Sequence, residues 1–522
     1  MSNSTNNVAT FLLEGKDPCS VALRMIDRGH TYGELQSRSE AIARYLEASG
    51  TQKGDRVLLL GDNSLFWVIS YLGILRAGLV CVPLPPNTAS SGLAYILHAT
   101  EARLVLAQAR FAAAHKNLLP PSQVITDRDV LSLTCVAGAD VTNAEKVCPH
   151  ENKKIPDLPE VEPDDLAALM FTSGSTGKPR GVEISHRNII ANTESIVQYL
   201  NLTGSDRIMT VLPFHYCFGT SLLHTHLRIG ASLVIDNRFM YPEKILERII
   251  DAGCTGFAGV PSHFQILLRK SSLRKKQFPR LRYVQQAGGH LAPSFVRELR
   301  EALPNTQIFV MYGQTEATAR LSYVPPEHLD RKLGSIGKAI PGVTLRVLDD
   351  SGKDAEPGQI GEIVASGANV ARGYWRDPEE SAKCFRDDKL YTGDLGTLDD
   401  EGFIFVVDRA KDFLKCGGKR VSCRQLEEKL LEFDELLEAA VVGVKDEILG
   451  EAVKAFIVPH GSCADGLEAR LLTFCKQHFP HQLVPKEIRL MNALPKNSAG
   501  KVLKQNLRLK EQRQEEHVLE RV

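Results

Sequence analysis

The sequence lacks the features that mark secreted, membrane-spanning or polyanion-binding proteins. Its 11 cysteines include no Cys-x-x-Cys pair and residues 1–16 hold no basic segment followed by an apolar run, so we predict reduced thiols and a cytoplasmic location. The most apolar long stretch, Val57–Leu84, contains Asp62, Asn63 and Arg76, which would be costly inside a bilayer. Lysine plus arginine equals aspartate plus glutamate, at 63 each. We therefore expect no integral membrane segment and no nucleic acid partner, and any polyanion must be held locally.

The 522 residues are enough for two or three domains. Apolar runs of strand length alternate with helical stretches, as in Arg56–Leu60, Leu65–Ala77 and Val80–Pro83, which is typical of layered α/β domains. From about Gly342, short strands and glycine-marked turns predict a small β-rich subdomain. The segment after Tyr391–Gly396 has its own strand and helix pattern and predicts a separate small α+β domain.

The strongest local pattern is the segment Leu169–Val182, with the sequence LMFTSGSTGKPRGV. An apolar strand leads into small hydroxyl residues, glycines and a cation, and such a loop can direct backbone N–H groups and hydroxyls at phosphate oxygens. A Walker A loop would need glycine in place of Thr172 and a serine or threonine in place of Pro179. The loop therefore predicts polyphosphate binding by something other than a P-loop kinase or ATPase.

Four further motifs follow in order along the chain. They are Met311–Ala317 (MYGQTEA), Tyr391–Leu395 (YTGDL), Asp408–Gly418 (DRAKDFLKCGG) and Leu494–Lys501 (LPKNSAGK). With the glycine-rich loop, the set resembles the adenylate-forming superfamily of acyl-CoA synthetases, peptide-synthetase adenylation domains and firefly luciferase. The resemblance covers nearly the whole chain.

The resemblance implies an α/β fold with a large amino-terminal domain and a small, mobile, α+β carboxy-terminal domain. The large domain would hold two stacked α/β subdomains and a distorted β-barrel. We expect it to span residues 1–408 and the small domain to span residues 409–522.

The resemblance also assigns the binding of ATP and Mg²⁺. Tyr312 would stack on adenine, Asp394 would bind the ribose, and Thr315 would contact the α-phosphate. Glu316, with Thr172, would hold the metal, because magnesium shared with phosphates requires hard oxygen ligands. The remaining residues expected at the nucleotide are Ser173, Gly174, Ser175, Thr176, Gly177, Lys178, Gly288, Gly289, Gly313, Gln314 and Arg409.

The chemistry explains why a further cation is needed. A carboxylate that attacks the α-phosphorus of ATP brings one anion against another, so charge must be neutralised at the reacting centre. Lys501 matches the family's catalytic lysine, and we expect it to act there with Thr315 and Glu316. Lys411 matches the hinge on which the small domain turns between an adenylating and a thioester-forming pose. Gly417 and Gly418 match the loop that narrows onto the pantetheine arm of the thiol.

The acid pocket is predicted beside Leu212–Gly219 (LPFHYCFG), which resembles an aromatic gate motif; many members have histidine where Tyr216 stands. The expected lining is Tyr216, Phe218, Thr220 and Val260. No acidic residue lies between Leu212 and Ile235. A buried ammonium needs a paired anion, so this absence argues against an α-amino acid and for an uncharged acyl chain.

The sequence thus predicts an AMP-forming ligase that activates a fatty or other hydrophobic acid to acyl-AMP and pyrophosphate. It would then transfer the acyl group to coenzyme A or to the phosphopantetheine of a separate acyl carrier protein. The main alternative is a stand-alone amino acid adenylation enzyme that loads a peptidyl carrier protein. A luciferase-like oxygenase shares the motifs but is rare on this scaffold, and a non-catalytic binding protein is disfavoured because Lys501, Glu316 and Asp394 are all present.

Overall fold

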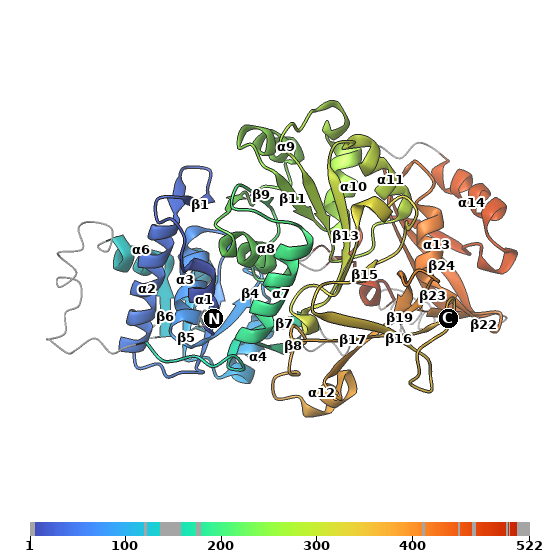
Figure 1. Cartoon of the computed structure of the whole chain (residues 1–522). Coiled ribbons are helices and arrows are strands. Elements are labelled where there is room, and N and C mark those ends of the chain that lie inside the picture. Colours follow the sequence, from blue (N-terminus) through green and yellow to red (C-terminus); the bar gives the residue numbers. More distant parts are fainter. Residues whose placement is uncertain are drawn as a thin grey trace, which may run out of the picture.

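The computed structural model describes residues 6–119, 123–135, 158–173, 179–409, 413–446, 449–461, 466–496, 500 and 502–508. None of the helices in these ranges is long and apolar enough to cross a membrane. Figure 1 shows the chain passing from an amino-terminal lobe through a central lobe to a small carboxy-terminal domain. Four sheets organise these parts.

A six-stranded sheet with the order β6-β5-β3-β4-β7-β8 forms the first α/β subdomain. Its strands are parallel except at the β7–β8 pair. The strand β4 is buried along its whole length, as expected where helices cover both faces of a parallel sheet. The elements are α2 (Tyr32–Ala48), β3 (Arg56–Leu60), α3 (Leu65–Arg76), β4 (Val80–Leu84), α4 (Ser90–Thr100), β5 (Leu104–Ala107), α5 (Ala109–Ala114), β6 (Val124–Thr126), α6 (Asp127–Cys135), β7 (Leu166–Ser173) and β8 (Pro179–Ser185).

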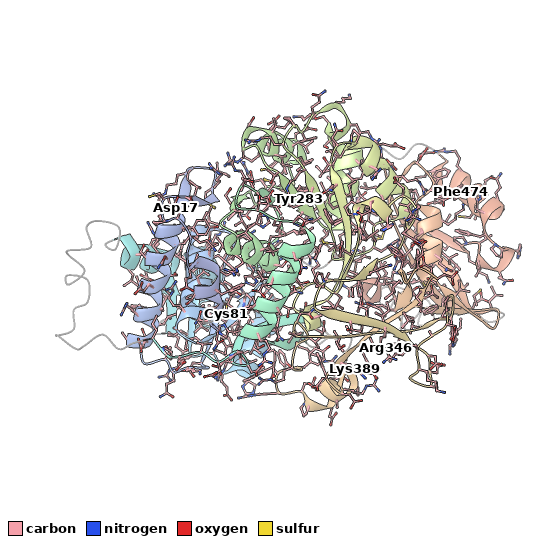
Figure 2. The ribbon with its side chains drawn as sticks, in the orientation of Figure 1. Asp17, Cys81, Tyr283, Arg346, Lys389 and Phe474 are labelled. Atoms are coloured by element: carbon pink, nitrogen blue, oxygen red, sulfur yellow. The ribbon has the colours of Figure 1, made fainter. Side chains whose placement is uncertain are left out.

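A nine-stranded sheet with the order β15-β14-β13-β12-β11-β9-β10-β1-β2 forms the second subdomain. Its centre is parallel and its outer strands are antiparallel. Tyr283 lies inside it (Figure 2), where its hydroxyl is 2.9 Å from His226 Nε2. The elements are β1 (Val21–Arg24), β2 (Gly29–Thr31), β9 (Arg207–Thr210), β10 (Ser232–Ile235), α9 (Pro242–Asp251), β11 (Gly256–Gly259), α10 (Pro261–Lys270), η4 (Leu273–Lys275), β12 (Tyr283–Gln286), α11 (Pro293–Ala302), β13 (Gln307–Tyr312), η5 (Thr315–Ala317), β14 (Ser322–Val324), η6 (Pro326–His328) and β15 (Lys338–Ala339).

Helices join the two subdomains through one apolar core. The helix α7 (His186–Tyr199) packs on β8 of the first sheet, α8 (Cys217–Arg228) packs on β9 and β10 of the second, and the two helices contact each other. The short helix α1 (Val8–Leu13) contacts α3, α7 and α8. This layering fixes the loop that precedes α8 relative to both sheets.

A curled five-stranded sheet follows, with the order β16-β17-β19-β18 and with β20 paired to β19. An isolated bridge between Gly337 and Ile404 links it to the end of the nine-stranded sheet. Its elements are β16 (Val343–Leu348), β17 (Gly361–Gly367), α12 (Pro378–Cys384), β18 (Phe385–Arg386), β19 (Lys389–Leu398) and β20 (Ile404–Arg409). The family resemblance implies a distorted β-barrel in this region, and the structure shows a curled half-barrel sheet.

The small domain is α+β. Its sheet has the order β22-β21-β24-β23, with β25 parallel to β24. Its elements are β21 (Phe413–Cys416), β22 (Lys419–Ser422), α13 (Cys423–Leu430), β23 (Leu436–Asp446), β24 (Gly450–Pro459), α14 (Leu467–His478), η7 (His481–Leu483) and β25 (Glu487–Leu490). The predicted fold class is therefore confirmed, whereas the domain boundary at residue 409 stays a prediction.

Candidate active site

Three distant motifs meet at the carboxyl end of β13. The Tyr312 hydroxyl donates a hydrogen bond of 2.6 Å to Asp394 Oδ2, and Arg409 Nε lies 3.2 Å from Asp394 Oδ1. Asp394 on β19 faces Arg409 on β20 in the strand register and is buried. Burial, and then the charge of Asp394, raise the pKa of Tyr312 well above its usual value, so the phenol remains a donor. The structure thus brings together three residues expected at the nucleotide.

A second contact fixes the predicted metal ligand. The Tyr374 hydroxyl donates to Glu316 Oε1 at 2.9 Å. The segment that carries Tyr374 is bonded to β8, because Glu183 N–H donates to the Gly373 carbonyl and Trp375 N–H donates to the Gly181 carbonyl. Burial, and then the charge of Glu316, raise the pKa of Tyr374 above its usual range. Glu316 is therefore a positioned carboxylate with one oxygen already oriented.

The described residues of the glycine-rich segment belong to the paired strands β7 and β8. Ser173 pairs with Pro179 and Thr172 pairs with Arg180, while η5, which contains Glu316, packs against β8. Gly174, Ser175, Thr176, Gly177 and Lys178 lie outside the described residues. Among the residues that are described, no three His, Cys, Asp or Glu side chains cluster as a metal site. A magnesium that keeps water and phosphate ligands needs only one or two carboxylates, so Glu316 fits this role, and the share assigned to Thr172 stays a prediction.

Gly288 brings the predicted adenine and acid sites into contact. It follows β12 with a φ of +81°, and a Cβ added there would lie 2.9 Å from Val260 Cγ1 and 3.9 Å from Phe218 Cδ1. The positive φ and the close contact together require glycine. Next to it, Gln286 Nε2 donates to the Gly289 carbonyl at 2.8 Å.

The loop before α8 is held by one amide side chain. Asn63 Nδ2 donates to the Leu212 carbonyl and Asn63 Oδ1 accepts from Phe214 N–H, both at 2.8 Å. Tyr216 is the residue that precedes α8, and its ring lies 4.5 Å from that of His215. Phe218, two residues further, is buried. The gate motif is thus a fixed loop.

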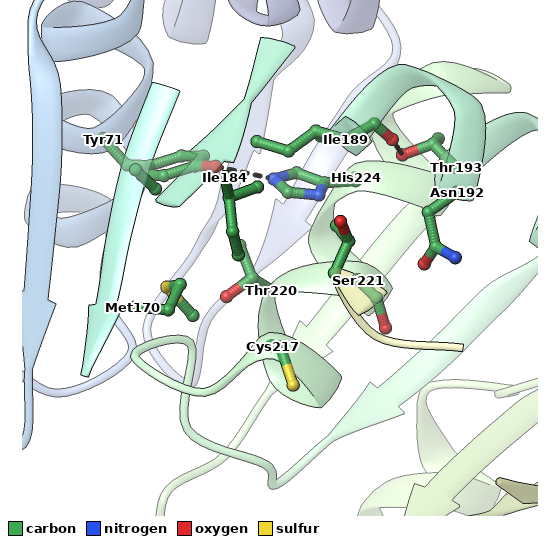
Figure 3. Close-up of a pocket in the computed structure, with 12 residues that line it drawn as sticks. Tyr71, Met170, Ile184, Ile189, Asn192, Thr193, Cys217, Thr220, Ser221 and His224 are labelled. Carbon is green, nitrogen blue, oxygen red and sulfur yellow. Dashed lines mark hydrogen bonds between the residues drawn. The ribbon is translucent and has the colours of Figure 1, made fainter. Parts of the chain in front are cut away.

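Thr220 faces a different space from Phe218. Its hydroxyl donates to the Tyr216 carbonyl at 2.9 Å, and the residue lines a small cavity of about 20 Å³. Figure 3 shows Thr220 there with Cys217, Ser221 and the hydrogen-bonded pair Tyr71 and His224. That volume holds about one water-sized group, so a contact between Thr220 and an acyl chain stays a prediction.

The last motif of the small domain lies against the large domain. A Cβ added to Gly500 would lie 3.1 Å from Val260 Cγ2 and 3.2 Å from Ser262 Oγ. Lys496 and Val502, on either side of Gly500 in the sequence, form an isolated bridge. Lys501, the predicted catalytic residue, and Lys411, the predicted hinge, lie outside the described residues, but Gly500, the neighbour of Lys501, lies against Val260 of the predicted acid pocket.

In this structure the small domain lies against the large domain, an arrangement that we call the docked pose. A polar cluster between the two domains stabilises it. His290 Nε2 lies 2.6 Å from Glu428 Oε1, and Arg424 donates to His290 Nδ1. Since an arginine can only donate, His290 is the neutral tautomer with its proton on Nε2. Burial, and then Arg424, lower its pKa to about 4. A second contact joins His460 Nε2 to the Arg269 carbonyl at 2.8 Å.

The predicted thiol loop lies elsewhere in this pose. Gly417 and Gly418 have φ values of +57° and +76° and form the exposed two-residue turn between β21 and β22, in the geometry of a type I′ hairpin. Figure 1 shows β22 on the outer side of the small domain, away from β13. The structure therefore does not bring these glycines to the nucleotide residues.

Sequence reasoning missed several residues that build the site. Tyr374, which orients Glu316, lies between two recognised motifs, and the sequence gives no signal for its contact. His290 and Arg424 come from different domains. Arg320, buried beside Phe218, lies just after the Met311–Ala317 motif.

Two family models match the chain. The AMP-binding enzyme model matches residues 15–375, and the AMP-binding enzyme C-terminal domain model matches residues 425–501. The chain belongs to the AMP-binding enzyme family. The long-chain-fatty-acid–CoA ligase of Salmonella typhimurium is 31% identical over 507 residues, which cover 92% of this chain and 89% of the relative.

Two further members of the family show its range. Feruloyl-CoA synthase of an Amycolatopsis species is 31% identical over 504 residues, covering 94% of this chain and 96% of the relative. The solved structure of o-succinylbenzoate CoA synthetase of Bacillus subtilis with its acyl-adenylate intermediate has a TM-score of 0.83 and 26% identity, covering 96% of this chain and 97% of that one. This AMP-binding enzyme is an AMP-forming acid–thiol ligase that uses ATP and magnesium.

Proposed function

We propose that the chain joins a hydrophobic carboxylic acid to AMP and then transfers the acyl group to coenzyme A. In the first step a carboxylate oxygen attacks the α-phosphorus of ATP, and the bond to pyrophosphate breaks. In the second step the thiol loses its proton, its sulfur attacks the acyl carbon, and AMP leaves. The observation that carries the proposal is Gly500 packed on Val260, because it supports a position of the adjacent Lys501 near the proposed acid pocket.

The described residues support specific roles in the first step. Asp394 presents two acceptor oxygens, and we assign it to the ribose hydroxyls, with Tyr312 on the adenine and Gly288 and Gly289 beside it. Thr315 is assigned to the α-phosphate; its hydroxyl lies 3.5 Å from Cys217 Sγ, at the start of α8. Gly313, Gln314, Arg409 and the loop Thr172–Lys178 complete the nucleotide site.

Charge neutralisation is the main task of the site. Glu316, with Thr172, would hold magnesium, which when bound withdraws charge from the phosphates. Lys501 would bridge the substrate carboxylate and the α-phosphate. Fixed cations directed at developing charge are typically worth roughly 3 to 4 kcal/mol, so we assign Lys501 the largest single contribution from a side chain.

The second step requires a different pose. Gly417 and Gly418 form an exposed turn, so we infer that the small domain rotates about Lys411 to bring them to the thiol. Hinge rotation uses backbone dihedrals of a few residues. The docked pose described above is then the adenylating one.

The acid and the acceptor follow from different observations. Phe218 and Val260 meet at Gly288, which supports an acid with an apolar body contacting them and Tyr216. Coenzyme A is the proposed acceptor because relatives named above are CoA ligases. A free-standing acyl carrier protein is the second candidate. We place the enzyme in the cytoplasm, and the described cysteines, which are free thiols, fit this location.

The test is an acid screen by pyrophosphate release from ATP, repeated with coenzyme A and with a phosphopantetheinylated carrier protein. We expect release that depends on the acid and a thioester on coenzyme A. The proposal would be contradicted if none of the acids in a broad panel caused pyrophosphate release, or if an amino acid were activated selectively. If a thioester formed only on the carrier protein, the acceptor would be the carrier protein in place of coenzyme A, and the proposed adenylation step would stand.

A further inference from the structure

Arg320 is a buried cation at the acid site, and no carboxylate of the described residues forms an ion pair with it. Its side chain is 1% exposed and its Nη2 atom has no hydrogen-bond partner among those residues. Desolvation lowers its pKa from the usual value, because burial without a counter-ion destabilises the charged form. The polar contacts of the guanidinium are with neutral groups, because its Nε lies 3.4 Å from Met311 Sδ and the Tyr199 hydroxyl is a hydrogen-bond partner. Buried charges are normally paired, and the described residues supply no counter-ion here.

Arg320 contacts residues that are assigned to the acid pocket. Its Cζ lies 4.1 Å from the centre of the Phe218 ring, the ring that also approaches Gly288. Cys217, the residue before Phe218, is in electrostatic contact with Arg320 and lies 3.5 Å from the Thr315 hydroxyl. The guanidinium therefore borders the proposed acid pocket, close to the position assigned to the α-phosphate.

The backbone that carries Arg320 is held rigidly. Thr318 has a φ of +66° and is the centre of a γ-turn, in which Ala319 N–H donates to the Ala317 carbonyl at 2.7 Å. A β-branched residue at positive φ is strained and persists only where its surroundings enforce it. Here Asn369 Nδ2 and Asn192 Nδ2 both donate to the Arg320 carbonyl, at 2.9 and 3.1 Å. A strained, doubly anchored loop that ends in a buried cation, with one guanidinium nitrogen unsatisfied among the described residues, has the form of a binding site.

We propose that Arg320 binds an anionic group on the acid, so that the substrate has a mainly apolar body and a second carboxylate, or an equivalent anion, near the reacting one. The inference rests on the proposed function and narrows its substrate class. The lack of acidic residues between Leu212 and Ile235, which argues against an α-amino acid, does not count against an acid with a second anionic group. An arginine fork pairs with a carboxylate through two parallel hydrogen bonds.

The experiment compares matched acids: succinate, adipate and suberate against butanoate, hexanoate and octanoate. Pyrophosphate release is measured for the natural enzyme and for Arg320→Met, Arg320→Lys and the control Arg346→Met. Arg346 is a partly exposed arginine on β16 that pairs with Asp354 (Figure 2). A second measurement records the rise in Tm that each acid causes in the presence of a non-hydrolysable ATP analogue, which needs no turnover.

We expect the natural enzyme to prefer one diacid over its matched monoacid. Arg320→Met should lower kcat/KM for that diacid by roughly 30-fold or more, since one partner of a buried charge pair is lost, and should spare or raise the rate with the monoacid. Arg320→Lys should restore part of the loss, and Arg346→Met should change neither rate.

Two results would overturn the inference. One is a natural enzyme that prefers the monoacids in both measurements. The other is an equal loss for both acids in Arg320→Met, which would assign Arg320 to the reacting carboxylate or to stability. If no acid releases pyrophosphate, the proposed function fails, and the Tm measurement still decides whether Arg320 selects diacids. If Arg320→Met does not fold, the Tm measurement on the natural enzyme alone shows whether diacids bind in preference to monoacids.

Discussion

Tyr374→Phe is the sharpest test of how the site is built, because it removes one hydroxyl and keeps the ring. The ring contacts of Tyr374 with Phe385, at 5.5 Å between centroids, and with Arg180, at 5.7 Å, should survive. The lost interaction is the hydrogen bond of 2.9 Å to Glu316 Oε1. Hydrogen bonds to charged groups contribute about 1.5–3 kcal/mol, equivalent to roughly 10- to 150-fold.

We expect the lower end of this range, about a 10-fold fall in kcat/KM for ATP, because water can replace the hydroxyl at a residue that is 9% exposed. The assay is acid-dependent pyrophosphate exchange with ATP and magnesium varied. The raised pKa of Tyr374 keeps the donor protonated below the ordinary tyrosine value, so the hydrogen bond is present from pH 7 to pH 9 and the defect should be equal at both. It would be lost only as the pH rises through the raised pKa.

The control for this prediction is Tyr45→Phe, at an exposed tyrosine. The reasoning is refuted if Tyr374→Phe exchanges pyrophosphate at the natural rate. It is also refuted if the loss follows a fall in Tm and disappears at lower temperature, because the hydroxyl would then act on stability alone.

Further predictions concern the two domains and pH. Lys411→Pro should spare adenylation or thioester formation but not both, and natural overall turnover would refute the hinge assignment. Glu428→Gln should weaken the docked pose by replacing the carboxylate that faces His290 and Arg424 with a neutral amide; adenylation should fall several-fold, thioester formation from supplied acyl-AMP should not, and an equal effect on both would contradict the assignment. Burial lowers the pKa of His224 and His226 to about 3 and 4, so the unfolded chain binds more protons below pH 6.5 and the free energy of unfolding should fall as the pH falls. Denaturant titrations at pH 7.5 and pH 5.5 check this, and equal stabilities would refute it.

The sequence predicted most of the architecture because its signals are local. Buried strands such as Val80–Leu84 read as continuous apolar runs, and the glycine-rich turns mark the half-barrel. The motifs predicted Tyr312, Asp394 and Arg409 as one group, and the structure brings them into contact.

The features of the site that could not be predicted from the sequence depend on tertiary contacts. The contact of Tyr374 with Glu316 spans 58 positions and forms only because the 372–375 segment is bonded to β8. The positive φ of Thr318 opposes the preference of a β-branched residue, and nothing local predicts it. Arg320 reads as an ordinary surface arginine until its burial is seen.

The central claim is that the small domain delivers Lys501 for adenylation and then rotates away for thioester formation. The most direct measurement assays both half-reactions of Lys501→Ala, using acid-dependent pyrophosphate exchange for the first and transfer from supplied acyl-AMP to coenzyme A for the second. We expect the rate of pyrophosphate exchange to fall by about 100-fold or more. The rate of acyl transfer to coenzyme A should stay close to that of the natural enzyme. Equal loss in both half-reactions, or natural pyrophosphate exchange, would contradict the claim.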